Sequence, residues 1–207
     1  MTSDRKPPLI IGLTGSIAMG KSTVAAMLEA EGVPVFDADA AVHILQGSNG
    51  LLVAEIEAAF PGTTGPLGVD RQKLGAAVLG DKQKLTQLES IIHPVVAKMR
   101  LAFLTENADA DIIVFDIPLL FEKGGHQSVD HIVVVSAPAD QQRARALSRP
   151  GMTIEKFENI LKLQTPDSEK RAQADTVIDT GQSIEHTRSQ VRALVKNLRD
   201  ALAVSNK

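Results

Sequence analysis

The stretch LIIGLTGSIAMGKSTVA, residues 9–25, decides the fold of this 207-residue chain. Residues 9–13 form a short apolar run typical of a buried strand, and residues 21–31 carry apolar side chains at helical spacing before Gly32. A second short apolar run follows at residues 33–36. A strand, a loop, a helix and another strand in this order predict a βαβ unit and therefore a parallel sheet.

The loop inside this stretch matches the phosphate-binding pattern G-x-x-x-x-G-K-[ST] at every defined position, from Gly15 to Ser22. Between a strand and a helix, backbone N–H groups and the positive end of the helix bind phosphates. We expect Lys21 to contact the β- and γ-phosphates and Ser22 to supply a hydroxyl to Mg²⁺. The residues predicted to bind the nucleotide are Gly15, Ser16, Ile17, Ala18, Met19, Gly20, Lys21, Ser22 and Thr23.

Three later segments, residues 111–120, 131–138 and 175–180, also have the composition of strands, and residues 183–204 predict a closing amphipathic helix. The intervening residues are mainly helical in pattern, with a loop and no strand at residues 61–68. The sequence thus predicts an α/β fold in one domain, residues 1–207, with a five-stranded parallel sheet flanked by helices. Residues 1–37, 108–142 and 175–207 form its core, 38–107 a helical insertion and 143–174 a lid.

Acidic residues follow two of the predicted strands. Asp116 ends the apolar run IIVFD, where a carboxylate is suited to holding a Mg²⁺-bound water. Asp37 and Asp39 follow the second strand, at the edge where open α/β sheets bind ligands. Two interpretations stay open for this pair. One aspartate caps the next helix, or a carboxylate orients an acceptor hydroxyl and accepts its proton.

A basic run crosses the last third of the chain and comprises Arg143, Arg145, Arg149, Lys156, Lys162, Lys170 and Arg171. Such a run is either a solvated helix face or a mobile lid whose cations close over a triphosphate. The five histidines lack metal-ligand spacing. The pair His93–Pro94 predicts a helix start, with proline at the first helical position, and His93 is also a candidate substrate contact.

Composition limits the function classes. A net charge of −3 argues against a general nucleic-acid binder, and the absence of cysteine excludes disulfides and thiolate metal sites. The polar N-terminus MTSDRKPP lacks the apolar centre of a signal peptide, and no apolar run reaches the ~20 residues that span a bilayer. We therefore expect a cytoplasmic protein with no membrane or nucleic-acid partner, either monomeric or a weak homo-oligomer.

Several segments together resemble successive signatures of the dephospho-coenzyme A kinase family: GLTGSIAMGKSTVA, VFDADAAVH, HP, DIPLLFEKGG and RPGMT…QTPDSEKRAQADTVIDT. The resemblance covers nearly the whole chain. It implies a P-loop NTPase fold and transfer of the γ-phosphoryl group of ATP to the ribose 3′-hydroxyl of dephospho-coenzyme A, with Mg²⁺ as cofactor. That reaction is the last step of coenzyme A synthesis.

Carried onto this chain, the resemblance implies that Asp39 is the general base and that Lys21, Arg145 and Arg149 are catalytic. Arg143 is a third candidate lid arginine. The implied metal-binding residues are Ser22 and Asp116. The implied substrate-binding residues are Asp37, Asp39, His43, His93 and Leu119.

One departure concerns the phosphate loop itself. The family's loop commonly reads G-G-I-G-S-G-K-S, whereas this chain has Ser16 and Ala18 in place of two glycines. Alanine adopts a positive φ with difficulty, so a left-handed conformation at residue 18 would strain or rearrange the loop.

Two alternatives stay open at this point. Another P-loop small-molecule kinase, such as a nucleoside monophosphate kinase, would have a similar core and lid. A GTP-dependent switch is disfavoured because the chain has no Asn-Lys-x-Asp element for guanine.

Overall fold

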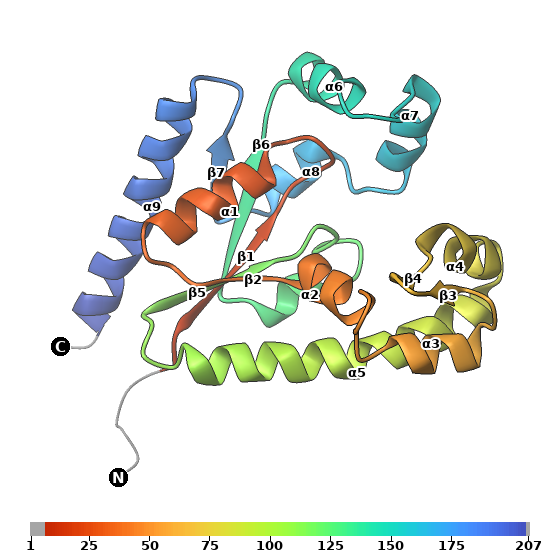
Figure 1. Cartoon of the computed structure of the whole chain (residues 1–207). Coiled ribbons are helices and arrows are strands. Elements are labelled where there is room, and N and C mark those ends of the chain that lie inside the picture. The colour runs from red at the N-terminus through yellow and green to blue at the C-terminus, as the bar shows by residue number, and fades with distance from the viewer. Residues whose placement is uncertain (1–6, 206–207) are drawn as a thin grey trace, which may run out of the picture. The chain divides into compact units, whose positions relative to one another are not determined.

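The computed structural model describes residues 7–205, which form two compact units (Figure 1). The first unit holds the described residues up to Phe36 and those from Asn107 onward, and the second unit is Asp37–Glu106. The segment MTSDRKPP, on which the prediction of no signal peptide depends, lies largely outside the described residues. Within residues 7–205, no helix has both the length and the apolar character needed to cross a membrane.

The first unit is built on a five-stranded sheet in the order β2-β5-β1-β6-β7, with β1 at the centre. Its strands are β1 (Leu9–Thr14), β2 (Val35–Asp37), β5 (Ile112–Asp116), β6 (His131–Ser136) and β7 (Thr176–Asp179). Its helices are α1 (Lys21–Ala30), the 3₁₀ helix η1 (Gly125–Ser128), α6 (Ala139–Leu147), α7 (Ile154–Lys162), α8 (Asp167–Ala172) and α9 (Ile184–Ser205). The predicted parallel sheet is confirmed, since β1 pairs parallel with both β5 and β6.

The strand predicted over residues 111–120 is shorter than expected and ends at Asp116. Pro118 has no N–H group to continue the ladder, and its carbonyl instead accepts a hydrogen bond from Oγ1 of Thr14 (3.2 Å). This early end leaves the Asp116 side chain at the carboxyl edge of the sheet, next to Leu13 of β1.

The main core lies between the sheet and the helices α1 and α9, which pack side by side on it (Figure 1). Val24 and Leu28 of α1 join Val191 and Val195 of α9 in one buried cluster. The closing helix predicted at residues 183–204 therefore packs on the core of its own chain. This packing fixes α1, and hence the helix end that follows the phosphate loop.

The second unit has a separate hydrophobic core, which includes Leu45, Ile56, Leu74 and Leu88. Its elements are α2 (Ala38–Leu45), α3 (Val53–Ala59), β3 (Thr64–Gly65), β4 (Gly68–Val69), α4 (Arg71–Val78) and α5 (Lys82–Glu106). The prediction of no strand at residues 61–68 is wrong, because Thr64 and Val69 pair in a small antiparallel hairpin. Strands of two residues are too short to produce an alternating pattern in the sequence.

The helix start predicted at His93–Pro94 is also wrong, because both residues lie inside the 25-residue helix α5. An internal proline lacks one helical hydrogen bond and costs about 3 kcal/mol or more. Apolar neighbours such as Ile92, Val95 and Val96 pack against the core of the second unit. This packing, which local propensity does not report, offsets the cost of the proline.

Candidate active site

The phosphate loop connects β1 to α1 and needs glycine at both ends for different reasons. A Cβ atom at Gly15 would lie 2.7 Å from the backbone oxygen of Val135, so a side chain cannot fit there. Gly20 caps α1 in the left-handed conformation, with φ of 92°. Inside the loop, the N–H of Met19 donates to the carbonyl of Ser16 (3.1 Å).

Ala18 adopts the left-handed conformation, which is strained for an alanine. Its φ is 62°, and it is the one non-glycine residue with positive φ among residues 7–205. Ala18 is 6% exposed and packs with Ala146 and Phe157. The loop therefore keeps the conformation that glycine would adopt freely, and the cost for an L-residue is about 1–2 kcal/mol.

Lys21 and Asp116 form an ion pair behind the loop, with Nζ donating to Oδ1. Asp116 is only 3% exposed. Within the part of the chain that the structure describes, no three His, Cys, Asp or Glu side chains gather as a metal cage. Asp116 and Ser22 nevertheless offer a carboxylate and a hydroxyl, and Mg²⁺ in kinases takes one or two protein oxygens beside water and phosphate. This donor set fits a magnesium ion held mainly by a triphosphate.

Thr180, just after β7, ties the sheet to the phosphate loop. Its Oγ1 donates to the carbonyl of Met19 (2.6 Å). Arg145 of α6 donates through Nη2 to the carbonyl of Thr180 (2.7 Å) and through Nη1 to its Oγ1 (3.2 Å). Of the predicted lid arginines, Arg145 is therefore linked to the loop by a single intervening residue.

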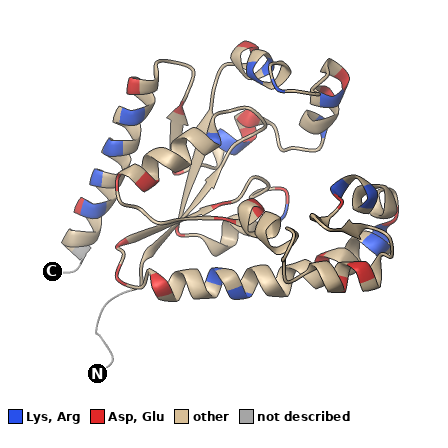
Figure 2. Ribbon diagram, viewed as in Figure 1, with Lys and Arg blue, Asp and Glu red and all other residues tan. Residues whose placement is uncertain are grey.

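The other two predicted lid arginines are placed differently. Nη1 of Arg143 lies 3.6 Å from Oε1 of Glu158 of α7, and both side chains are about half exposed. Arg149 is exposed just beyond α6. Figure 2 shows basic residues along α6–α8 and along α9. Among the described residues, Arg145 is the lid arginine that hydrogen-bonds to Thr180, which holds the loop.

Lys170, counted in the same basic run, is neither solvated nor free to close over a ligand. It is fully buried in α8, and its Nζ lies 2.8 Å from Oε1 of Glu122. Oε1 of Glu122 also accepts the N–H of Thr165 (2.8 Å). Burial opposes the charged form of Glu122, but these bonds hold its pKa below the ordinary value. The pairing was not foreseen, since 48 residues of sequence separate the partners and no local pattern connects them.

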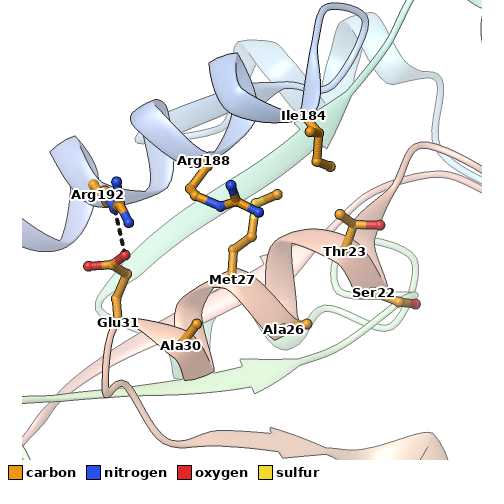
Figure 3. Close-up of a pocket in the computed structure, with 9 residues that line it drawn as sticks. All are labelled: Ser22, Thr23, Ala26, Met27, Ala30, Glu31, Ile184, Arg188 and Arg192. Carbon is orange, nitrogen blue, oxygen red and sulfur yellow. Dashed lines mark hydrogen bonds and ion pairs between the residues drawn. The ribbon is translucent and has the colours of Figure 1, made fainter.

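A groove of about 610 Å³ runs along α1 and α9, and Figure 3 shows its lining side chains. At one end lie Ser22 and Thr23, which follow Lys21, opposite Ile184 at the start of α9. At the other end, Nε of Arg192 donates to Glu31 (2.9 Å). The groove therefore joins hydroxyl groups of the phosphate-loop region to a partly apolar wall.

The second unit carries four of the five predicted substrate-binding residues, Asp37, Asp39, His43 and His93. Asp37 caps α2, with Oδ1 accepting the N–H of Ala40 (2.9 Å), so the capping interpretation is confirmed for this residue. Asp39 is exposed in the first turn of α2 and lines a pocket of about 410 Å³ together with Arg71 and Leu88. Asp39 has no capping bond of its own, which leaves its carboxylate available to a ligand.

His43 lies one turn after Asp39 in α2, and its Nδ1 contacts Nη2 of Arg71. Arg71, at the first position of α4, also lines a neighbouring pocket of about 290 Å³ with His43. Sequence reasoning missed Arg71, because a lone arginine at a helix start carries no motif. His93 is exposed on α5, and Leu119, in the first unit, is partly exposed in the turn after β5.

Comparisons with known proteins agree with this geometry. The family model described as dephospho-CoA kinase matches residues 9–186. A dephospho-CoA kinase of Novosphingobium aromaticivorans is 62% identical over 93% of this chain and 96% of its own length. One from Mesorhizobium japonicum is 54% identical over 92% of this chain and 97% of its own.

A solved structure from Thermus thermophilus, titled TT1252, superposes with a TM-score of 0.81 at 33% identity, over 93% of this chain and 99% of its own. The strand order, the glycine-bounded loop and the relatives agree, and the chain belongs to the dephospho-coenzyme A kinase family.

Proposed function

We propose that this protein transfers the γ-phosphoryl group of ATP to the ribose 3′-hydroxyl of dephospho-coenzyme A, giving coenzyme A and ADP. The observation that carries the proposal is the complete phosphate loop, with Lys21 in place behind it, in a chain of this family. The relatives that carry the name of this enzyme match the chain over nearly their whole length.

In the donor half of the reaction, loop N–H groups and the start of α1 bind the phosphates of ATP. When the triphosphate binds, Lys21 leaves Asp116 and contacts the β- and γ-phosphates instead. Ser22 and Asp116 would hold a Mg²⁺ ion, which would supply positive charge to neutralise the phosphate oxygens. The α6–α7 segment acts as the lid, while the buried Lys170 keeps α8 anchored to Glu122. Arg145 and Arg149 supply cations to the charge that develops on the transferred group.

In the acceptor half, Asp39 orients the 3′-hydroxyl and accepts its proton as the new P–O bond forms and the bond to ADP breaks. Arg71 and His43 line the pockets next to Asp39, and we assign them to the anionic groups of the acceptor. His93, Asp37 and Leu119 remain further candidates for acceptor binding.

The groove between α1 and α9 supports a position for the nucleoside of ATP. Its Thr23–Ile184 end adjoins the phosphate loop and offers an apolar side chain. An apolar wall beside anchored phosphates suits a purine base, which presents a flat apolar face.

The experiment that separates this proposal from a nucleoside monophosphate kinase is an acceptor panel. ADP release is followed in a coupled assay with ATP and Mg²⁺, using dephospho-coenzyme A, AMP, CMP, UMP and GMP in turn. We expect release only with dephospho-coenzyme A. Faster release with a nucleoside monophosphate would contradict the proposal.

A further inference from the structure

Both backbone groups of Ile17, inside the phosphate loop, are held by glutamine side chains from distant parts of the chain. Oε1 of Gln164, just after α7, accepts the N–H of Ile17 (3.0 Å). Nε2 of Gln142, in α6, donates to the carbonyl of Ile17 (2.9 Å). The two bonds use one donor and one acceptor of the same residue, so they fix its orientation from two sides.

Each glutamine is itself held in place. Gln142 is buried in α6, and its amide has little room to move. Gln164 precedes Thr165, whose N–H donates to Glu122, the buried partner of Lys170. The anchor of the Ile17 amide therefore extends through Gln164 into the interior of the first unit.

The next residue is Ala18, which has the left-handed conformation described above. The amide between Ile17 and Ala18 is trans, so its carbonyl and its N–H point in opposite directions. Gln142 holds the carbonyl toward α6, and the N–H of Ala18 consequently points away from α6. Among the described residues, no group accepts a hydrogen bond from that N–H.

We infer that Gln142 and Gln164 are positioning residues that hold the Ile17 amides so that the N–H of Ala18 is presented to the nucleotide phosphates. Without them, alanine at residue 18 would relax toward negative φ and turn this donor away. A glycine there would need less support, because it occupies both regions readily. This inference rests on the proposed function, since it assumes that the loop binds the phosphates of ATP and ADP.

The test is a double-mutant cycle on ADP binding, which involves no turnover. The dissociation constant of ADP is measured by calorimetry for Gln164→Met and Gln142→Met, each with Ala18 and with Ala18→Gly. Methionine keeps the length of glutamine and loses its amide. With Ala18, we expect binding about tenfold weaker, and with the glycine about threefold weaker or less. Gln173→Met, at an exposed position after α8, should bind ADP like the wild type.

A second readout separates positioning from a general loss of structure. Amide hydrogen exchange, resolved by NMR, should accelerate at Ile17 in Gln164→Met while the amides of the central strand β1 keep their protection. Gln164 is only partly buried, so this variant remains informative if Gln142→Met does not fold. A purely structural role would lower the melting temperature and leave ADP affinity of the folded protein unchanged.

Unchanged ADP affinity in the glutamine variants would overturn the inference, and so would an equal loss with alanine and glycine at residue 18. Failure of the wild-type protein to bind ADP would instead overturn the proposed function, and this inference with it.

Discussion

Lys170 and Glu122 form an ion pair of 2.8 Å in which the lysine has no exposed surface. Glu122 belongs to the DIPLLFE segment after β5, and Lys170 belongs to α8. The pair therefore joins the turn that follows β5 to α8, the helix that follows the proposed lid. Removing one partner of a buried pair leaves the other charge uncompensated, which is costly.

We expect Lys170→Met to lower the free energy of unfolding by about 3–5 kcal/mol. The double variant Lys170→Met/Glu122→Gln should lose less unfolding free energy than the single variant, because neither partner leaves a buried charge. Urea denaturation measures both. The matched control is Lys196→Met. Nζ of Lys196 lies 3.1 Å from Asp200, and both side chains are largely exposed, so this variant should lose less than about 1 kcal/mol of unfolding free energy. Equal losses at the two lysines would contradict this account of the buried pair.

The same pair predicts a dependence of stability on pH. Because the pKa of Glu122 is lower in the folded chain than in the unfolded chain, its contribution is present above the unfolded value. That contribution is lost as the pH falls through the folded value. The difference in unfolding free energy between wild type and Glu122→Gln should therefore shrink as the pH falls from about 6 to about 3. A difference that stays constant over this range would show that Glu122 does not titrate in this way.

Gly15→Ala tests the close approach between the phosphate loop and β6. Its Cβ would meet the backbone oxygen of Val135, which cannot move without disturbing the sheet, so we expect a loss of about 1–3 kcal/mol. Gly65→Ala, where an added Cβ meets no atom within 4 Å, is the control and should be nearly neutral. Thermal unfolding of both variants checks the difference, and similar melting temperatures would argue against the close contact.

Ile184→Ala tests the position proposed for the nucleoside. Truncating this partly exposed side chain removes apolar surface that would contact the base. ATP binding should therefore weaken about fivefold. Binding of inorganic tripolyphosphate, which has no base, should change by less than about twofold. Leu101→Ala, at a more exposed leucine of α5 outside the groove, is the control. Equal weakening of ATP and tripolyphosphate would place the base elsewhere.

Asp39→Asn tests the proposed general base. The amide keeps the shape of the side chain and cannot accept the proton, so turnover should fall by about 100-fold or more. The dissociation constant of ADP should stay within about twofold, because Asp39 belongs to the acceptor half. Asp200→Asn, on the surface of α9, should behave like the wild type in both assays. Near-normal turnover in Asp39→Asn would remove Asp39 from this role.

The sequence was sufficient to predict what depends on local pattern. The loop from Gly15 to Ser22, the five parallel strands and the capping role of Asp37 all have signals within a few residues. The strain expected if residue 18 is left-handed also followed from local reasoning, and the φ of Ala18 meets that condition.

What the sequence could not predict depends on contacts between distant residues. Gln164 and Gln142 contact Ile17 across more than 120 residues, and the burial of Lys170 depends on Glu122. Pro94 looked like a helix start because the packing that carries α5 through it is tertiary. Periodicity reports only which face of an element is apolar. It does not show which element packs against that face, or that this packing offsets the cost of a residue such as Pro94.

The central claim is tested most directly by incubating the protein with ATP, Mg²⁺ and dephospho-coenzyme A and identifying the product by mass spectrometry. We predict coenzyme A, with the new phosphate on the ribose 3′-oxygen by fragmentation, formed in equal amount to ADP. ADP released without coenzyme A, or a phosphate found at another position, would contradict the account.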